Sequence, residues 1–121
     1  MTIFSKNDGS YRGDNPVYQE KRRTPRIVFI AVAEITDQES GGQLTGRVSE
    51  LSAYGCYVDI QNTLPAPRTV TIKIFAGSEC FEATANVIYA HQNLGMGLVF
   101  QEISLQSGNL LRHWLVKGIS T

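Results

Sequence analysis

From residue 27 onward, apolar and polar positions alternate with a period of two, as in β-strands with one buried face. In the segment 69–75, Val70, Ile72 and Ile74 share one face and polar residues occupy the other. Glycine, proline and polar residues interrupt this pattern at short intervals and predict turns. The expected strands are residues 27–36, 44–52, 54–60, 69–75, 79–90 and 94–100.

Six short strands joined by hairpin-like turns are typical of a small barrel. The expected fold class is therefore mainly β: a six-stranded antiparallel β-barrel over about residues 27–100. Residues 27–36 are apolar on both faces, which predicts a strand covered on two sides. In the segment 79–90, the alternation places Tyr89 on the same face as Phe81 and Val87. Tyr57, Phe75, Phe81, Tyr89 and Phe100 are accordingly expected mostly in the core.

The C-terminal segment changes to a helical period. Ser104 can cap a helix over about residues 104–117, with Gly118 as its stop. The apolar stripe of this helix is predicted to cover one mouth of the barrel. Its expected members are Leu105, Leu110, Leu111, Trp114, Leu115 and Ile119.

With 121 residues, the chain has the length of one domain, expected over residues 20–118, and residues 1–19 resemble a flexible leader. The chain carries 11 basic and 11 acidic residues, but six basic and only three acidic ones lie within the first 26 residues. Such a local cluster indicates a discrete anionic ligand more than a long polyanion, although a solvated charge run is the plain alternative. No polymeric nucleic acid partner is expected.

The longest apolar run, residues 27–33, is too short to span a bilayer, and the N-terminus lacks the apolar core of a secretory signal. A cytoplasmic location without membrane insertion is therefore expected. Catalytic and metal-binding patterns are also absent: His91 and His113 have no ligand spacing, and Cys56 is most simply a small buried residue. We expect no enzyme activity, no metal and no cofactor.

Two segments carry chemistry that fits together. In the first, residues 21–26, Pro25 favours an extended backbone. The Cα atoms of Arg22 and Arg26 can therefore lie up to roughly 13 Å apart. Arginine pairs with phosphate, donates to the O6 and N7 atoms of guanine and stacks on bases. Lys21 and Arg23 are secondary candidates for the same anion.

The second segment, residues 50–55, ends a strand and enters a turn. The Glu50 carboxylate can accept from the N1–H and N2–H₂ edge of guanine, and the Ser52 hydroxyl can bridge base, ribose or phosphate. Gly55 permits a positive φ or the close approach of a ligand to the backbone. Taken alone, this segment is equally an ordinary polar turn.

In this order, RxxxR at residues 22–26 and [D/N]xSxxG at residues 50–55 resemble the motifs of the PilZ domain, a bacterial receptor for cyclic di-GMP. Residues 95–100 are similar to the closing GxGxxF strand of that family, and the resemblance covers roughly residues 20–117. It implies that Arg22, Arg26, Glu50, Ser52 and Gly55 bind cyclic di-GMP. It also implies that binding reorders the N-terminal segment and that the signal passes to an unidentified effector protein.

Glu50 departs from the family pattern, which has Asp or Asn at this position. The extra methylene displaces the carboxylate by roughly 1.5 Å and adds a rotor, so retained but weaker binding is expected. One alternative is a PilZ-like adaptor that has lost nucleotide binding. Another is a small barrel that binds single-stranded nucleic acid, although its aromatic row is not evident from the sequence.

Overall fold

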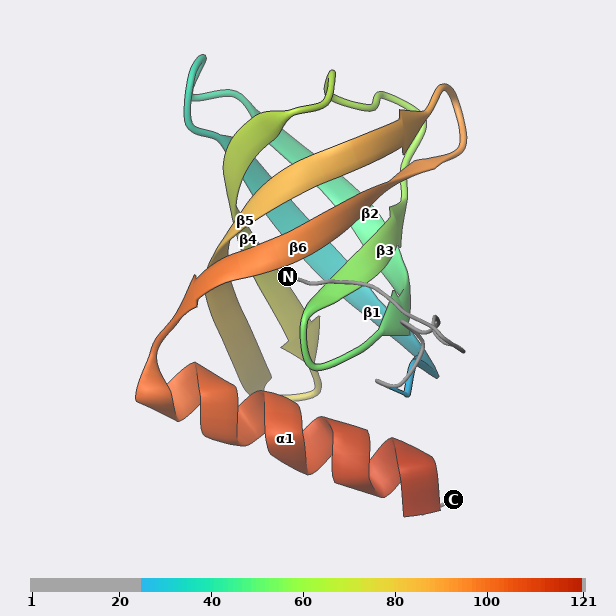
Figure 1. The fold of residues 1–121 in the computed structure, drawn as a ribbon, viewed down its shortest axis with the longest axis vertical. Coiled ribbons are helices and arrows are strands. Elements are labelled where there is room, and N and C mark those ends of the chain that lie inside the picture. Colours follow the sequence, from blue (N-terminus) through green and yellow to red (C-terminus); the bar gives the residue numbers. More distant parts are fainter. Residues whose placement is uncertain (1–24, 121) are drawn as a thin grey trace, which may run out of the picture.

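The computed structural model describes residues 25–120 (Figure 1). Six strands precede one helix along the chain. They are β1 (Ile27–Asp37), β2 (Gln43–Leu51), β3 (Gly55–Asp59), β4 (Arg68–Ala76), β5 (Glu79–His91), β6 (Gly95–Ile103) and α1 (Leu105–Ser120). Each strand expected from the alternation is present, with ends shifted by at most three residues.

The six strands form a closed antiparallel barrel in the order β1-β2-β3-β6-β5-β4. Sequential strands pair as hairpins except β3 and β4: β3 pairs with β6, and β4 pairs with β1, which closes the barrel. The closed barrel confirms the expected fold class. Closure also leaves no strand edge exposed among these six strands, so ligands and partners can meet only the outer face or the ends.

The core consists of the inward side chains of every strand. Phe81, Ile35 and Leu51 are the largest of the fully buried apolar side chains. The inner face of β4, predicted from Val70, Ile72 and Ile74, is confirmed, because all three are fully buried. Cys56 is buried as expected, and both cysteines are free.

Helix α1 closes one end of the barrel, as predicted (Figure 1). Trp114 carries this contact: its ring lies 4.9 Å from that of Phe29 and 6.3 Å from that of Phe81, centroid to centroid. Its indole N–H donates to the Glu79 carboxylate at 2.8 Å. The apolar body of Trp114 therefore fills the barrel mouth while its polar atom bonds at the rim.

Two predictions about this helix were wrong. In the expected stripe, Leu111, Trp114 and Leu115 are buried and Leu110 is partly buried against the core, as predicted. Leu105 is 81% exposed, because it lies about 200° around the helix from the buried Ser107. Gly118 does not stop the helix, which continues to Ser120. A Cβ at Gly118 would overlap the Ile27 side chain, so this glycine permits close packing against β1.

The Ser104 cap is confirmed, because its hydroxyl accepts the amide of Ser107 at 3.1 Å. Ile119, expected in the stripe, lies outside the described side chains.

The prediction that the first strand is covered on both sides was also wrong. Val28, Ile30 and Val32 are 81%, 60% and 51% exposed on its outer side. Only the inner face of β1 meets the core, because the barrel is a single layer and α1 lies at its end rather than over its wall. β-branched residues on the outer side reflect strand propensity rather than burial.

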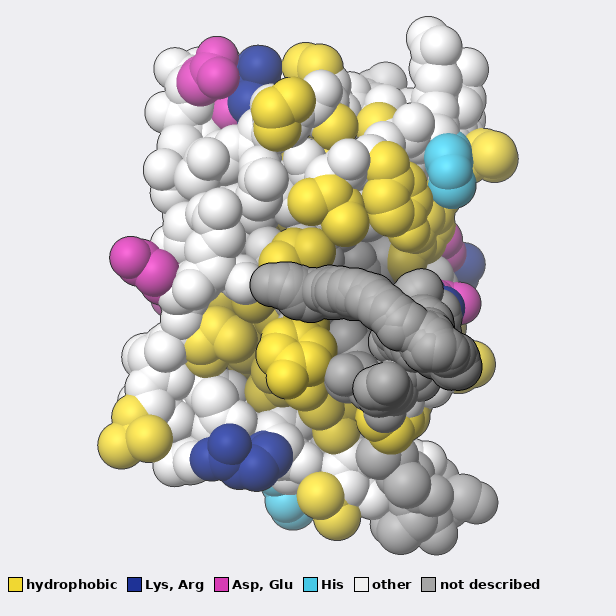
Figure 2. Space-filling view, viewed as in Figure 1, with side chains coloured by type: hydrophobic (Ala, Val, Ile, Leu, Met, Phe, Trp, Pro, Cys, Tyr) yellow, Lys and Arg dark blue, Asp and Glu magenta, His cyan; other side chains and the backbone are white. Residues whose placement is uncertain are grey.

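Strand β5 contains a bulge that reverses its alternation. The register against β6 shifts between Val87 and Tyr89, so the side chain of Tyr89 lies outside the barrel instead of inside. Ile88 and Tyr89 are consecutive and both exposed, at 48% and 41%. Hydrophobic side chains accordingly gather over the outer face formed by β3, β5 and β6 (Figure 2). The expected core position of Tyr89 is thus corrected. Tyr57 and Phe75, also expected in the core, are only half-buried.

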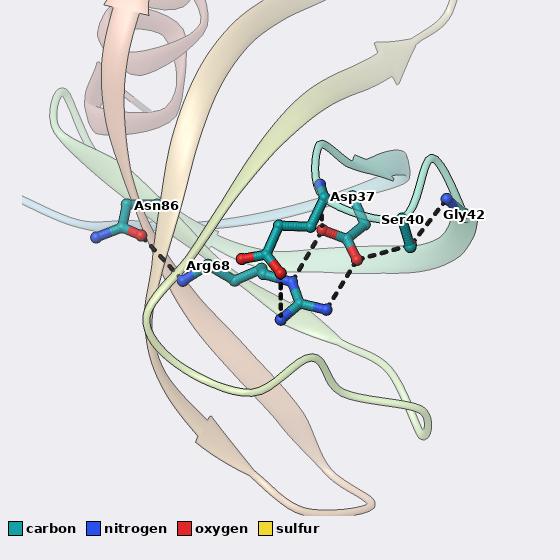
Figure 3. A network of polar contacts seen from close by, with 6 residues as sticks. Asp37, Ser40, Gly42, Arg68 and Asn86 are labelled. Carbon is teal, nitrogen blue, oxygen red and sulfur yellow. Dashed lines mark hydrogen bonds and ion pairs between the residues drawn. The ribbon is translucent and has the colours of Figure 1, made fainter.

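The opposite end of the barrel is held by a buried ion pair (Figure 3). Arg68 donates to both carboxylate oxygens of Asp37, at 2.9 and 3.0 Å. The Ser40 hydroxyl and the Glu39 amide donate to the same carboxylate, at 2.8 and 3.1 Å. These bonds, with that from Arg68 foremost, hold the pKa of Asp37 well below its usual range despite burial of the carboxylate.

Candidate functional site

A groove of about 210 Å³ lies on the outer wall of the barrel. One side is formed by Arg26, which precedes β1, and by Glu50 near the end of β2. The rest of its lining comes from the β2–β3 turn and from residues of β3, β5 and β6. The two segments singled out in the sequence are therefore neighbours in space, although 24 residues separate Arg26 from Glu50.

The β2–β3 turn is held by the Ser52 hydroxyl. This oxygen accepts the amides of Tyr54 and Gly55, both at 3.2 Å, and lies in donor range of the Gly55 carbonyl at 3.3 Å. The Ser52 amide donates to the same carbonyl at 2.9 Å. Serine suits this position because its short hydroxyl can satisfy backbone groups of its own turn. Its bonds make Ser52 a determinant of the turn's shape, and it is buried.

Gly55 has a steric role rather than a conformational one. Its φ is not positive, and a Cβ at this position would overlap the backbone carbonyl oxygen of Leu98 on β6. The amide of Phe100 donates to the Tyr54 carbonyl at 2.8 Å and anchors the same turn to β6. Of the two alternatives considered for Gly55, the positive φ is absent, and the close approach that occurs is between the backbones of β3 and β6.

Arg26 and Glu50 form an ion pair on this side of the groove, with 3.4 Å between Nη1 and Oε1. Their side chains are 63% and 50% exposed, so water screens the pair. Such exposed pairs contribute about 0–1 kcal/mol to stability. An anionic or hydrogen-bonding ligand can therefore separate the two groups at small cost.

Of the site residues predicted from the sequence, Arg26, Glu50, Ser52 and Gly55 all line this groove. Lys21, Arg22 and Arg23 lie outside the described residues, as does the expected leader, residues 1–19.

Sequence reasoning missed the tyrosines of the groove, Tyr54, Tyr57 and Tyr89. Tyr57 on β3 and Tyr89 on β5 are both register partners of Gly97, which lies between them on β6. A Cβ at Gly97 would overlap the Tyr89 ring, and one at Gly95 would overlap the Tyr57 ring. The available signal was the pair of glycines at 95 and 97, since a glycine within a strand often leaves room for a large neighbour.

The Tyr57 hydroxyl is hydrogen-bonded to Nδ1 of His91 at 3.2 Å. Burial raises the pKa of Tyr57, and the neighbouring Tyr89, Asp59 and Glu50 add to the rise. Tyr57 is therefore neutral at physiological pH and contributes a ring and a hydroxyl, not a charge. His91 lies at the end of β5 beside this ring.

Within residues 25–120, no three His, Cys, Asp or Glu side chains are grouped so that they could hold a metal ion. Burial raises the pKa of the Cys56 thiol to about 12, so this groove residue is not a nucleophile at neutral pH. No helix in the described part of the chain is long and apolar enough to cross a membrane.

A closed six-stranded barrel followed by a C-terminal helix defines the chain as a small β-barrel domain. The PilZ domain profile matches residues 20–117, and the chain belongs to the PilZ domain family. No curated protein matches the chain in sequence.

Solved structures show the same fold. The PilZ domain of CeSA from a cellulose-synthesizing bacterium matches with a TM-score of 0.64 and 22% identity, over 80% of this chain and 99% of that one. The PilZ domain of YcgR from Escherichia coli, solved with c-di-GMP, matches with a TM-score of 0.69 and 16% identity, over 84% and 93%. The Bacillus subtilis inhibitor of motility MotI/DgrA matches with a TM-score of 0.69 and 16% identity, over 82% of this chain but 51% of that one.

Proposed function

We propose that this chain is a receptor for cyclic di-GMP that signals to an effector protein and has no catalytic activity of its own. The observation that carries the proposal is the meeting of the two motif segments: Arg26 is paired with Glu50, and both line one groove together with Ser52 and Gly55 of the β2–β3 turn. Membership of the PilZ family and the fold shared with the YcgR domain, solved with c-di-GMP, support this ligand.

Each groove residue has a distinct part in this proposal. The Arg26 guanidinium pairs with phosphate or with the O6 and N7 atoms of guanine. The Glu50 carboxylate accepts from the N1–H and N2–H₂ edge of the base. Ser52 and Gly55 fix the turn on which the base rests, since the Ser52 hydroxyl bonds to the turn's own backbone.

The volume of the groove indicates how much of the ligand it holds. At about 210 Å³ it is smaller than the roughly 300–1,000 Å³ of typical small-molecule pockets. It therefore takes one part of a cyclic dinucleotide, and other groups must meet the rest. We assign that role to Arg22, with Lys21 and Arg23 as secondary contacts, because these cations directly precede Arg26.

Isothermal titration with cyclic di-GMP tests the proposal, with cyclic di-AMP and GTP as control nucleotides. The wild-type chain is expected to bind cyclic di-GMP selectively, and Arg22→Ala and Arg26→Ala are expected to abolish the heat. Arg112→Ala is the matched control, because Arg112 is an exposed arginine on α1 that does not line the groove. Equal losses in all three variants would show a nonspecific charge effect and contradict the assignment.

The proposed output is a rearrangement of the N-terminal segment when ligand binds. The basic residues from Lys21 to Arg26 are trypsin sites, so cleavage there reports access to this segment. Cyclic di-GMP is expected to slow this cleavage, while cyclic di-AMP should leave it unchanged. Undiminished cleavage at saturating ligand would contradict the conformational part of the proposal.

One observation favours a second candidate, a PilZ-like adaptor that no longer binds the nucleotide. Arg26 and Glu50 satisfy each other in the ion pair, and Glu50 replaces the Asp or Asn of the family pattern. An absence of heat at tens of micromolar cyclic di-GMP would favour this adaptor. Under either function, the effector protein and the cytoplasmic location remain predictions.

A further inference from the structure

Two tyrosine rings extend the groove along the outer face of the barrel. Met96 and Leu98 point into the core, so Gly97 between them faces outward, where the Tyr89 ring covers it. Tyr57 covers Gly95 in the same way. Each ring therefore lies against the β6 backbone. We call Tyr57 and Tyr89 together the aromatic shelf.

The shelf is held in place by its neighbours. The ring centroids of Tyr57 and Tyr89 are 6.3 Å apart, with 32° between the ring planes. The ring centroid of His91 lies 5.2 Å from that of Tyr89 and 6.0 Å from that of Tyr57. Its Nδ1 is hydrogen-bonded to the Tyr57 hydroxyl. Rings fixed before a ligand arrives lose little conformational entropy when they bind it.

Part of the shelf remains open to solvent. Tyr89 is 41% exposed, and its exposed neighbours Ile88 and Val99 line the same groove. A buried tyrosine would be fully explained by packing, but this ring is only partly covered. An exposed aromatic surface beside an arginine and a carboxylate suits a planar ring with apolar faces and polar edges, which describes a purine base.

We propose that the aromatic shelf, through Tyr89, stacks on one guanine base of the ligand. Glu50 binds the N1–H and N2–H₂ edge of this base, and Arg26 binds either its O6 and N7 atoms or a phosphate of the ligand. This inference rests on the proposed function, since it assigns a further binding residue of that site. It gives the receptor an apolar contact that the two sequence motifs do not contain. The affinity of the chain therefore depends on Tyr89 as well as on the motif residues.

Titration of Tyr89→Leu and Tyr89→Phe with cyclic di-GMP tests the shelf. Leucine still covers Gly97 but lacks an aromatic face, so affinity is expected to fall roughly 5- to 150-fold. Phenylalanine retains the face and should keep wild-type affinity. Leu94→Ala, which removes a 69% exposed apolar side chain outside the groove, is the matched control and should leave affinity unchanged.

A second measurement needs no substitution in the site. Stacking of a purine shifts the NMR signals of the Tyr89 ring protons upfield in the wild-type chain, whereas binding elsewhere leaves them unshifted. Wild-type binding without this shift, or with full affinity in Tyr89→Leu, would overturn the shelf and leave the receptor function standing. No binding of cyclic di-GMP by the wild-type chain would overturn the receptor function and the shelf with it.

Discussion

At the residue scale, Glu50 has two competing partners: Arg26 and the guanine edge that we propose it binds. Its carboxylate is oriented towards the groove, and it lies 3.4 Å from Arg26. The glutamate side chain is long enough to make this ion pair from β2, and an aspartate at the same position would be one methylene shorter. The position at which this chain departs from the family motif is therefore also the one that pairs with Arg26, the arginine proposed to bind the ligand.

Glu50→Asp is accordingly expected to raise the affinity for cyclic di-GMP, by about tenfold. The substitution releases Arg26 and removes one rotor that must be fixed on binding. Titration of Glu50→Asp beside wild type measures the change, and Glu102→Asp, an exposed carboxylate of β6 outside the groove, is the control. Unchanged affinity in Glu50→Asp would contradict this account of Glu50.

The two cysteines differ in environment and should differ in reactivity. Cys56 is buried and its pKa is raised to about 12, whereas Cys80 is exposed. A thiol reagent at pH 8 is therefore expected to label one cysteine in the native chain and two after denaturation. Cys80→Ser should abolish labelling of the native chain. Rapid labelling of native Cys80→Ser would show that Cys56 is accessible, contrary to the structure.

At the element scale, the β2–β3 turn depends on how closely it approaches β6. A Cβ at Gly55 would overlap the Leu98 carbonyl oxygen, and backbone atoms cannot move aside as a side chain can. Gly55→Ala is therefore expected to lower the free energy of unfolding by about 1–3 kcal/mol, measured in urea. It should also weaken ligand binding, because residues of the turn line the groove.

Gly108→Ala is the matched control for this prediction. Gly108 lies within α1, and its added Cβ would be 3.8 Å from Ile103, an ordinary contact. Alanine is the better helix former by about 1 kcal/mol, so this variant should gain stability. Equal losses in both variants would contradict the steric argument for Gly55.

The period-two alternation predicted the strands well, and the helical period predicted the helix. Both patterns depend only on residues that are close in the sequence. The errors arose where contacts across strands or between elements decide. The bulge that turns Tyr89 outward is a register shift against β6. Counting alternate residues along β5 alone does not reveal this shift and therefore places Tyr89 on the inner face. Likewise, Gly118 has a stop-like residue type, but its contact with Ile27 is the reason for the glycine.

The candidate site was predictable to the extent that motifs carry it. Arg26, Glu50, Ser52 and Gly55 were singled out by type and spacing, and the fold brings them to one groove. Tyr57 and Tyr89 could not be found in this way, since their proximity depends on β6 lying between β3 and β5. The order of strands in the barrel brings the two tyrosines together, and a local sequence pattern does not predict that order.

At the scale of the whole molecule, the two ends of the barrel are closed by different chemistry. Helix α1 closes one end mainly with apolar side chains, and Asp37 with Arg68 holds the other. The Asp37 side chain is only 3% exposed, so its charge is compensated by hydrogen bonds rather than by water. Protonation of Asp37 at low pH should therefore lower the free energy of unfolding.

The sign follows from the lowered pKa of Asp37, which arises chiefly from its bond with Arg68. A carboxyl whose folded pKa lies below its unfolded value of about 3.9 stabilises the fold above that pH, and this contribution is lost as the pH falls towards the folded pKa. Urea midpoints are thus expected to be steady from pH 7 to about 5 and to fall progressively below it. Asp37→Asn should be less stable at pH 7 and lose less on acidification, whereas Glu102→Gln should follow wild type. An acid slope of wild-type size in Asp37→Asn would show that other carboxylates control acid unfolding of the barrel.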